Sequence, residues 1–130
     1  MNTNQLAWVC VGGAVGSGLR FVVTSWTLAR YGTSFPYGTL AVNVVGSLLL
    51  ALLFELSRST TWLGPTLQLA LGAGMMGGLT TYSTFNLEMV RYVQEGQMRM
   101  ALVYGAATIV TCLLAGAAGL ALGRLIATSP

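Results

Sequence analysis

The 130-residue sequence is poor in charge, and three ionisable residue types are missing from it. Only 7% of its residues are charged, as Arg or Glu, and it has no Lys, Asp or His. A soluble domain has about a quarter of its residues charged, so this chain cannot cover a surface that faces water. The lack of His and Asp, with only two separated cysteines, excludes histidine-based triads and zinc sites. Six scattered Arg form no basic patch, so a nucleic-acid-binding protein is not expected. The low charge and the lack of His and Asp also argue against an ordinary soluble enzyme.

Hydrophobic residues make up 55% of the chain and gather in four long stretches. Each is close to the length of about 20 residues that a helix needs to cross a bilayer. The four stretches are residues 6–26, 37–56, 67–89 and 100–122. The connections between them are short and contain Gly, Ser and Pro, so we predict one all-α, four-span membrane domain over residues 1–130. Cys10 and Cys112 fall in different spans and are expected to be free thiols.

The Arg residues give little information about orientation in the membrane. If the spans alternate, the two sides carry nearly equal numbers: Arg58 and Arg124 on one, and Arg30, Arg91 and Arg99 on the other. Such a split is a very weak positive-inside signal. It allows either a weak preference for one orientation or insertion in both, with an antiparallel dimer, and the near balance favours the second.

Polar residues inside the spans line up on helix faces. Two sets have helical spacing: Thr39, Asn43 and Ser47 in the second span, and Tyr104, Thr108 and Thr111 in the fourth. Such groups either hydrogen-bond neighbouring helices together or line a polar pathway, and the pattern supports both interpretations.

No acidic residue or His is expected deep in a span, because Glu55 and Glu88 fall near span ends. Proton-coupled carriers usually need such a group inside the membrane. The polar groups that remain are an amide, hydroxyls and Arg20, which sits within the first span near its end. These donors suit a small anion better than a cation, so the residues favour a small pore or carrier for an anion.

The third span contains a Gly-Gly pair, Gly77-Gly78, followed by Thr and Ser residues among two aromatics. This composition is poor material for an uninterrupted helix, and we predict a break at the glycine pair. Free carbonyls at a break can coordinate a hard cation. The alternative is an intact helix packed through small residues, because Gly74 and Gly78 form a GxxxG pair. Similar pairs are Gly12/Gly16 and Gly119/Gly123.

Three motifs resemble one known family, the Fluc (CrcB) fluoride channels, over nearly the whole chain. They are Gly12-Gly13-Ala14-Val15-Gly16 with Arg20, Gly38-Thr39-Leu40 with Asn43 and Gly46, and Gly77-Gly78-Leu79-Thr80-Thr81-Tyr82-Ser83-Thr84-Phe85. The chain departs from the family at Tyr82, where Phe is usual.

The resemblance implies an antiparallel homodimer in the cell inner membrane, with two pores that let toxic fluoride leave the cytoplasm passively. It further implies a structural sodium ion at the dimer centre, held by backbone carbonyls of Gly77 and Thr80. Arg20 would lie near a vestibule. The residues expected along the fluoride pathway are Thr39, Asn43, Tyr82, Ser83, Thr84, Phe85, Tyr104 and Thr108.

Fluoride is small and strongly hydrated, so a pore must replace its lost water with other donors. The Asn43 amide and the hydroxyls can supply them, and the aromatic ring edges are weakly electropositive. The alternative function is a small-multidrug-resistance-type four-span exporter. That class relies on a Glu in its first span, and residues 6–26 contain none.

Overall fold

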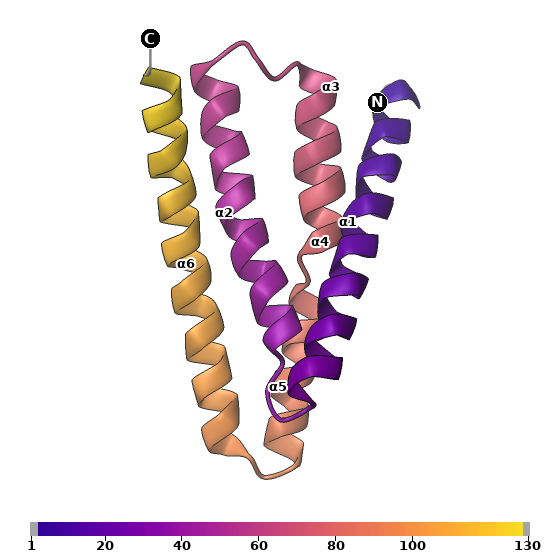
Figure 1. The fold of residues 1–130 in the computed structure, drawn as a ribbon, viewed down its shortest axis with the longest axis vertical. Coiled ribbons are helices and arrows are strands. Elements are labelled where there is room, and N and C mark those ends of the chain that lie inside the picture. The colour runs from indigo at the N-terminus through magenta and orange to yellow at the C-terminus, as the bar shows by residue number, and fades with distance from the viewer. Residues whose placement is uncertain (1–2, 129–130) are drawn as a thin grey trace.

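The chain forms a bundle of long helices that run up and down (Figure 1). A computed structural model describes residues 3–128. Its helices are α1 (Thr3–Tyr31), α2 (Tyr37–Ser59), α3 (Pro65–Gln68), the π-helix η1 (Leu69–Met76), α4 (Gly77–Leu79), α5 (Tyr82–Gln94) and α6 (Met98–Thr128). The α1–α2 and α5–α6 turns lie at one end of the bundle, and the α2–α3 connection lies at the other (Figure 1). The expectation of an all-α fold is confirmed.

Three of these helices, α1, α2 and α6, are long and apolar enough to cross a membrane. Each extends beyond the apolar stretch that predicted it, because a helix continues into the polar residues at its ends. The fourth predicted stretch, residues 67–89, is divided among α3, η1, α4 and α5, which follow one another down the bundle (Figure 1).

Large apolar side chains cover the outside of the bundle. Phe21 is 72% exposed and Leu113 is 69% exposed, while the buried core is small. An outward-facing apolar surface of this extent suits contact with lipid or with other protein. The chain is therefore a multi-pass membrane protein.

Glycines bring the helix backbones into direct contact. A Cβ atom at Gly16 would collide with the carbonyl oxygen of Met75, so α1 lies directly on η1. A Cβ atom at Gly119 would collide with the carbonyl oxygen of Leu48, so α6 lies directly on α2. The close packing predicted from the GxxxG pairs is thus present together with the break, although the two were considered as alternatives.

The break occurs after the glycine pair, and its predicted position at Gly77-Gly78 is wrong. Helix α4 runs through both glycines, and the backbone becomes extended only at Thr80 and Thr81. Gly78 lies against α1, where a Cβ would stand 2.5 Å from the carbonyl oxygen of Gly13. Gly78 therefore serves helix packing, whereas no atom lies within 4 Å of the position that a Cβ would take at Gly77. The helical turn ends because Asn43, on another helix, hydrogen-bonds to Thr81.

Candidate functional site

Asn43 on α2 holds the break open with two hydrogen bonds to Thr81. The Thr81 N–H donates to Asn43 Oδ1 at 2.8 Å, and Asn43 Nδ2 donates to the Thr81 carbonyl at 3.2 Å. This pairing gives the N–H of residue 81 a side-chain acceptor in place of the carbonyl of Gly77, so the helix ends. The Thr81 hydroxyl then caps α5 by accepting the N–H of Thr84 at 3.2 Å.

Arg20 on α1 also contacts the extended segment at the break. Its Nη1 lies 3.4 Å from the Thr80 carbonyl oxygen, a long hydrogen bond between α1 and the extended segment. The sequence placed Arg20 near the end of a span, but α1 continues to Tyr31, so Arg20 lies well inside the helix. Its positive charge offsets the carbonyl dipoles exposed where the chain leaves the helix.

Glu88 is the functional candidate that sequence reasoning missed. Its carboxylate accepts the Thr39 hydroxyl at 2.8 Å and the Tyr104 hydroxyl at 2.6 Å, and Tyr104 is fully buried. Glu88 lies inside α5, which continues to Gln94, and its partner Thr39 lies in the first turn of α2, so the carboxylate lies near one end of the bundle. Helical spacing could have identified Glu88 as a candidate, because it follows Thr81 by seven residues and so lies on the same side of the helix.

A groove of about 330 Å³ runs beside the break and contains several of the predicted residues. Its lining includes Asn43, Tyr82, Phe85, Thr108 and Cys112. The Thr108 hydroxyl is buried and, among residues 3–128, has no hydrogen-bond partner. A buried hydroxyl without a partner is costly, so a ligand or water that accepts its proton would be stabilised here.

Aromatic rings connect the groove to the Glu88 carboxylate. The ring centroids of Phe85 and Tyr104 are 5.2 Å apart with an edge-to-face arrangement, and those of Tyr82 and Phe85 are 6.0 Å apart. Tyr82 is 78% exposed, so its ring stands at the outer wall of the groove. The structure therefore places Tyr82 and Phe85 next to each other, as their spacing predicts.

The remaining polar candidates lie less deeply. Ser83 and Thr84 are exposed and interact with the Thr81 hydroxyl. Ser47 and Thr111 donate to carbonyls of their own helices, at 2.7 Å and 2.6 Å respectively. The two predicted sets of polar residues thus contribute Thr39, Tyr104 and Thr108 to the buried interior, while Asn43 is half-buried beside the break. Cys10 and Cys112 are free, as expected.

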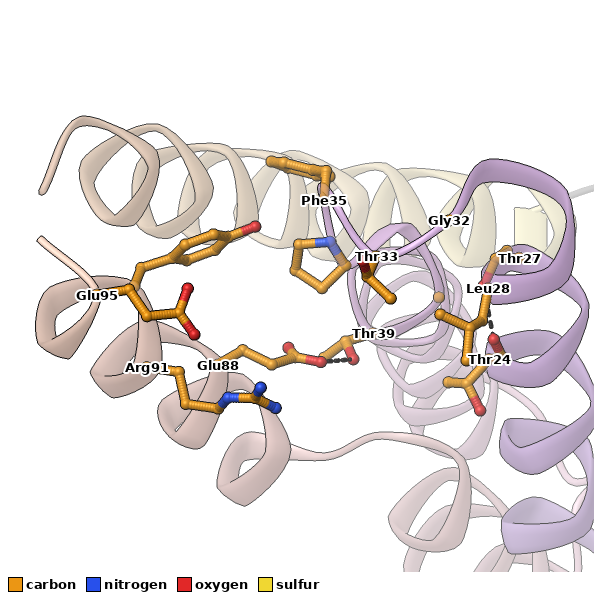
Figure 2. A pocket seen from close by; sticks show the side chains of 13 residues that line it. Thr24, Thr27, Leu28, Gly32, Thr33, Phe35, Thr39, Glu88, Arg91 and Glu95 are labelled. Carbon is orange, nitrogen blue, oxygen red and sulfur yellow. Dashed lines mark hydrogen bonds between the residues drawn. The ribbon is translucent and has the colours of Figure 1, made fainter. Parts of the chain in front are cut away.

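A second cavity, of about 300 Å³, opens near the α1–α2 turn. Figure 2 shows side chains of α5 on one side of it and Thr24 and Thr27 of α1 on the other. Glu88 reaches it from α5 and is hydrogen-bonded there to Thr39. The sequence does not reveal this cavity, because its lining comes from α1, the α1–α2 turn, α2 and α5, and α5 is far from the other three in the chain.

The two carbonyl groups expected to bind sodium have the right chemistry for a hard cation. Gly77 is exposed, and no atom lies within 4 Å of the position that a Cβ would take. The Thr81 N–H donates to Asn43 and therefore does not occupy the Gly77 carbonyl. Two carbonyls from one chain are too few oxygen ligands, so water or a second chain would have to supply the rest. The Thr80 carbonyl also accepts a long hydrogen bond from Arg20, so a cation there would share that oxygen with a guanidinium, and the Gly77 carbonyl fits the role better.

Comparison with known proteins gives consistent matches over nearly the full length. The family described as CrcB-like protein, Camphor Resistance (CrcB), matches residues 7–120. A fluoride-specific ion channel FluC of Sorangium cellulosum is 46% identical over 117 residues, covering 90% of this chain and 92% of that protein. The protein of that name from Anaeromyxobacter sp. is 46% identical over 123 residues, covering 95% and 98%. That from Citrifermentans bemidjiense is 38% identical over 122 residues, covering 94% and 98%.

Proposed function

This chain belongs to the CrcB-like protein family, and we propose that it is a channel that conducts fluoride passively across a membrane. The observation that carries the proposal is its 46% identity, over 95% of the chain, to a protein named as a fluoride-specific ion channel. The geometry supports it, because the polar groups among α2, α5 and α6 include buried hydroxyls and a half-buried amide, which are donors suited to an anion.

The pathway would run along the groove beside the break and then past the Glu88 cluster. Thr108 offers a hydroxyl with no partner in the described chain, and the Phe85 ring lines the same groove. The hydroxyls of Thr39 and Tyr104 both donate to the Glu88 carboxylate, so these two groups can hold a negatively charged acceptor. Fluoride must compete with the Glu88 carboxylate for these donors while that carboxylate repels it, so the ion is held only weakly here.

The proposed assembly is an antiparallel homodimer with sodium at its centre. The exposed apolar surface, the exposed Gly77 and the incomplete set of carbonyl ligands support a second chain against the break. The nearly even distribution of Arg between the two ends supports insertion in both orientations. Lys residues added to the α1–α2 turn should bias insertion and reduce flux, and co-expression with an oppositely biased chain should restore it. Full activity from one forced orientation would exclude the antiparallel arrangement.

Fluoride efflux from proteoliposomes tests the function itself. Purified protein, reconstituted alone and with chloride as the control anion, should release internal fluoride quickly once potassium movement balances the charge. Protein-free liposomes supply the background. Equal rates of fluoride and chloride release, or a rate no higher than background, would contradict the proposal.

A further inference from the structure

The cavity near the α1–α2 turn carries an unusual arrangement of charge. Glu88, Arg91 and Glu95 all line it from α5, and Figure 2 shows their side chains on the same side of the hollow. Residues three, four and seven positions apart share a helix face, so these three groups act on the same small volume. Two carboxylates and one guanidinium leave this volume with one net negative charge at neutral pH.

Arg91 is not neutralised by an ion pair of its own. Among residues 3–128 the only ion pair joins Arg124 to Glu55, at 3.7 Å and at another part of the bundle. Glu95 instead accepts a hydrogen bond from Gln97 at 3.0 Å, and Glu88 is bonded to Thr39 and Tyr104. The Arg91 side chain is exposed, so its charge acts on whatever enters the cavity.

The cavity leads to the same carboxylate that the proposed pathway passes. Its lining joins exposed Thr33 in the turn to buried Thr39, whose hydroxyl is bonded to Glu88. An anion that comes in from this end must therefore pass two carboxylates that lie on one side of the cavity (Figure 2). Without Arg91 the cavity would hold two negative charges and would repel the anion before it reached a donor.

We propose that this cavity is the mouth of the fluoride pathway and that Arg91 is the residue that makes it passable to an anion. Arg91 offsets one of the two carboxylate charges, so the local concentration of fluoride is higher than it would be without this side chain. The inference rests on the proposed function, and it assigns to Arg91 the attraction of fluoride at the entrance of the pathway.

Salt dependence and charge compensation test the assignment by flux. Arg91→Gln should lower fluoride efflux about threefold to tenfold at ~10 mM ionic strength and less than about twofold at ~0.5 M, because salt screens the charge. The double variant Arg91→Gln/Glu95→Gln restores the net charge and should recover most of the flux. Arg99→Gln removes an exposed charge outside the cavity and is the matched control. Equal flux of Arg91→Gln and the unaltered protein at low salt would overturn the proposal.

A labelling experiment measures the potential in the mouth without any flux. Thr33→Cys, in a chain with Cys10→Ala and Cys112→Ala, is treated with a negatively or a positively charged methanethiosulfonate reagent. Adding Arg91→Gln should lower the ratio of negative to positive labelling rates about threefold or more at low salt. An unchanged ratio overturns the assignment. A lowered ratio in a protein that passes no fluoride supports the charge of Arg91 while it overturns the proposed function.

Discussion

Replacing Asn43 with Asp tests whether the residue that holds the break open also acts on the ion. Asp keeps the shape and the oxygen that accepts the Thr81 N–H at 2.8 Å, but it loses the donor that reaches the Thr81 carbonyl at 3.2 Å. A buried carbonyl left without its donor costs about 1–3 kcal/mol of stability. The remaining charge-assisted bond to the Thr81 N–H offsets part of this loss, so the fold should survive.

The effect on fluoride should be much larger than the effect on the fold. An anion passing about 6 Å from the new carboxylate, at an effective dielectric constant of about 20, is repelled by about 3 kcal/mol. That energy corresponds to about a hundredfold in rate. Efflux of fluoride from proteoliposomes gives the rate, and size-exclusion chromatography and thermal unfolding in detergent show whether the protein is still folded.

Ser47→Ala is the matched control for this experiment. Ser47 lines the same groove one helical turn away, and its hydroxyl donates only to the Asn43 carbonyl within α2. Its loss should therefore change efflux less than about twofold. If folded Asn43→Asp conducts at the rate of the unaltered chain, Asn43 only joins helices and the reasoning about the pathway is refuted.

Three further substitutions separate pathway from packing. Phe85→Ile keeps apolar character but removes the aromatic ring that lines the groove, so efflux should fall at least about tenfold in a folded protein, whereas Tyr82→Phe should keep most of it. Thr108→Val removes a hydroxyl that has no partner in the described chain, so thermal stability should hold or rise by about 1 kcal/mol while efflux falls; a loss of stability would show that the hydroxyl is structural. Gly16→Leu drives a side chain into the Met75 carbonyl and should destabilise the protein by about 3 kcal/mol, measured by thermal unfolding; an unchanged melting temperature would contradict the close packing of α1 on η1.

Local patterns in the sequence were enough to predict the helices and their glycine contacts. Apolar runs near membrane length predicted α1, α2 and α6, because the length and hydrophobicity of a run can be read from that segment alone. The GxxxG spacing predicted direct backbone contact, which occurs at Gly16 and Gly119. Helical spacing likewise predicted that Tyr82 and Phe85 would be neighbours.

Features that depend on two distant segments could not be predicted in the same way. The break lies at Thr80-Thr81 because Asn43, 38 residues away in sequence, supplies its hydrogen bonds. Nothing near Leu69–Met76 signals a π-helix, which follows from packing on α1. The role of Glu88 was missed because its buried donors, Thr39 and Tyr104, come from two other helices that the local sequence does not reveal.

Selective fluoride conduction is the central claim, and the reversal potential in a planar bilayer tests it most directly. Purified protein is placed between solutions with a tenfold fluoride gradient in one direction and a tenfold chloride gradient in the other. A membrane potential contributes about 2.3 kcal/mol per 100 mV, so a tenfold gradient of a monovalent ion balances at about 59 mV. The current should reverse at the potential of that size set by fluoride. Reversal near zero, or at the opposite potential set by chloride, would contradict the claim.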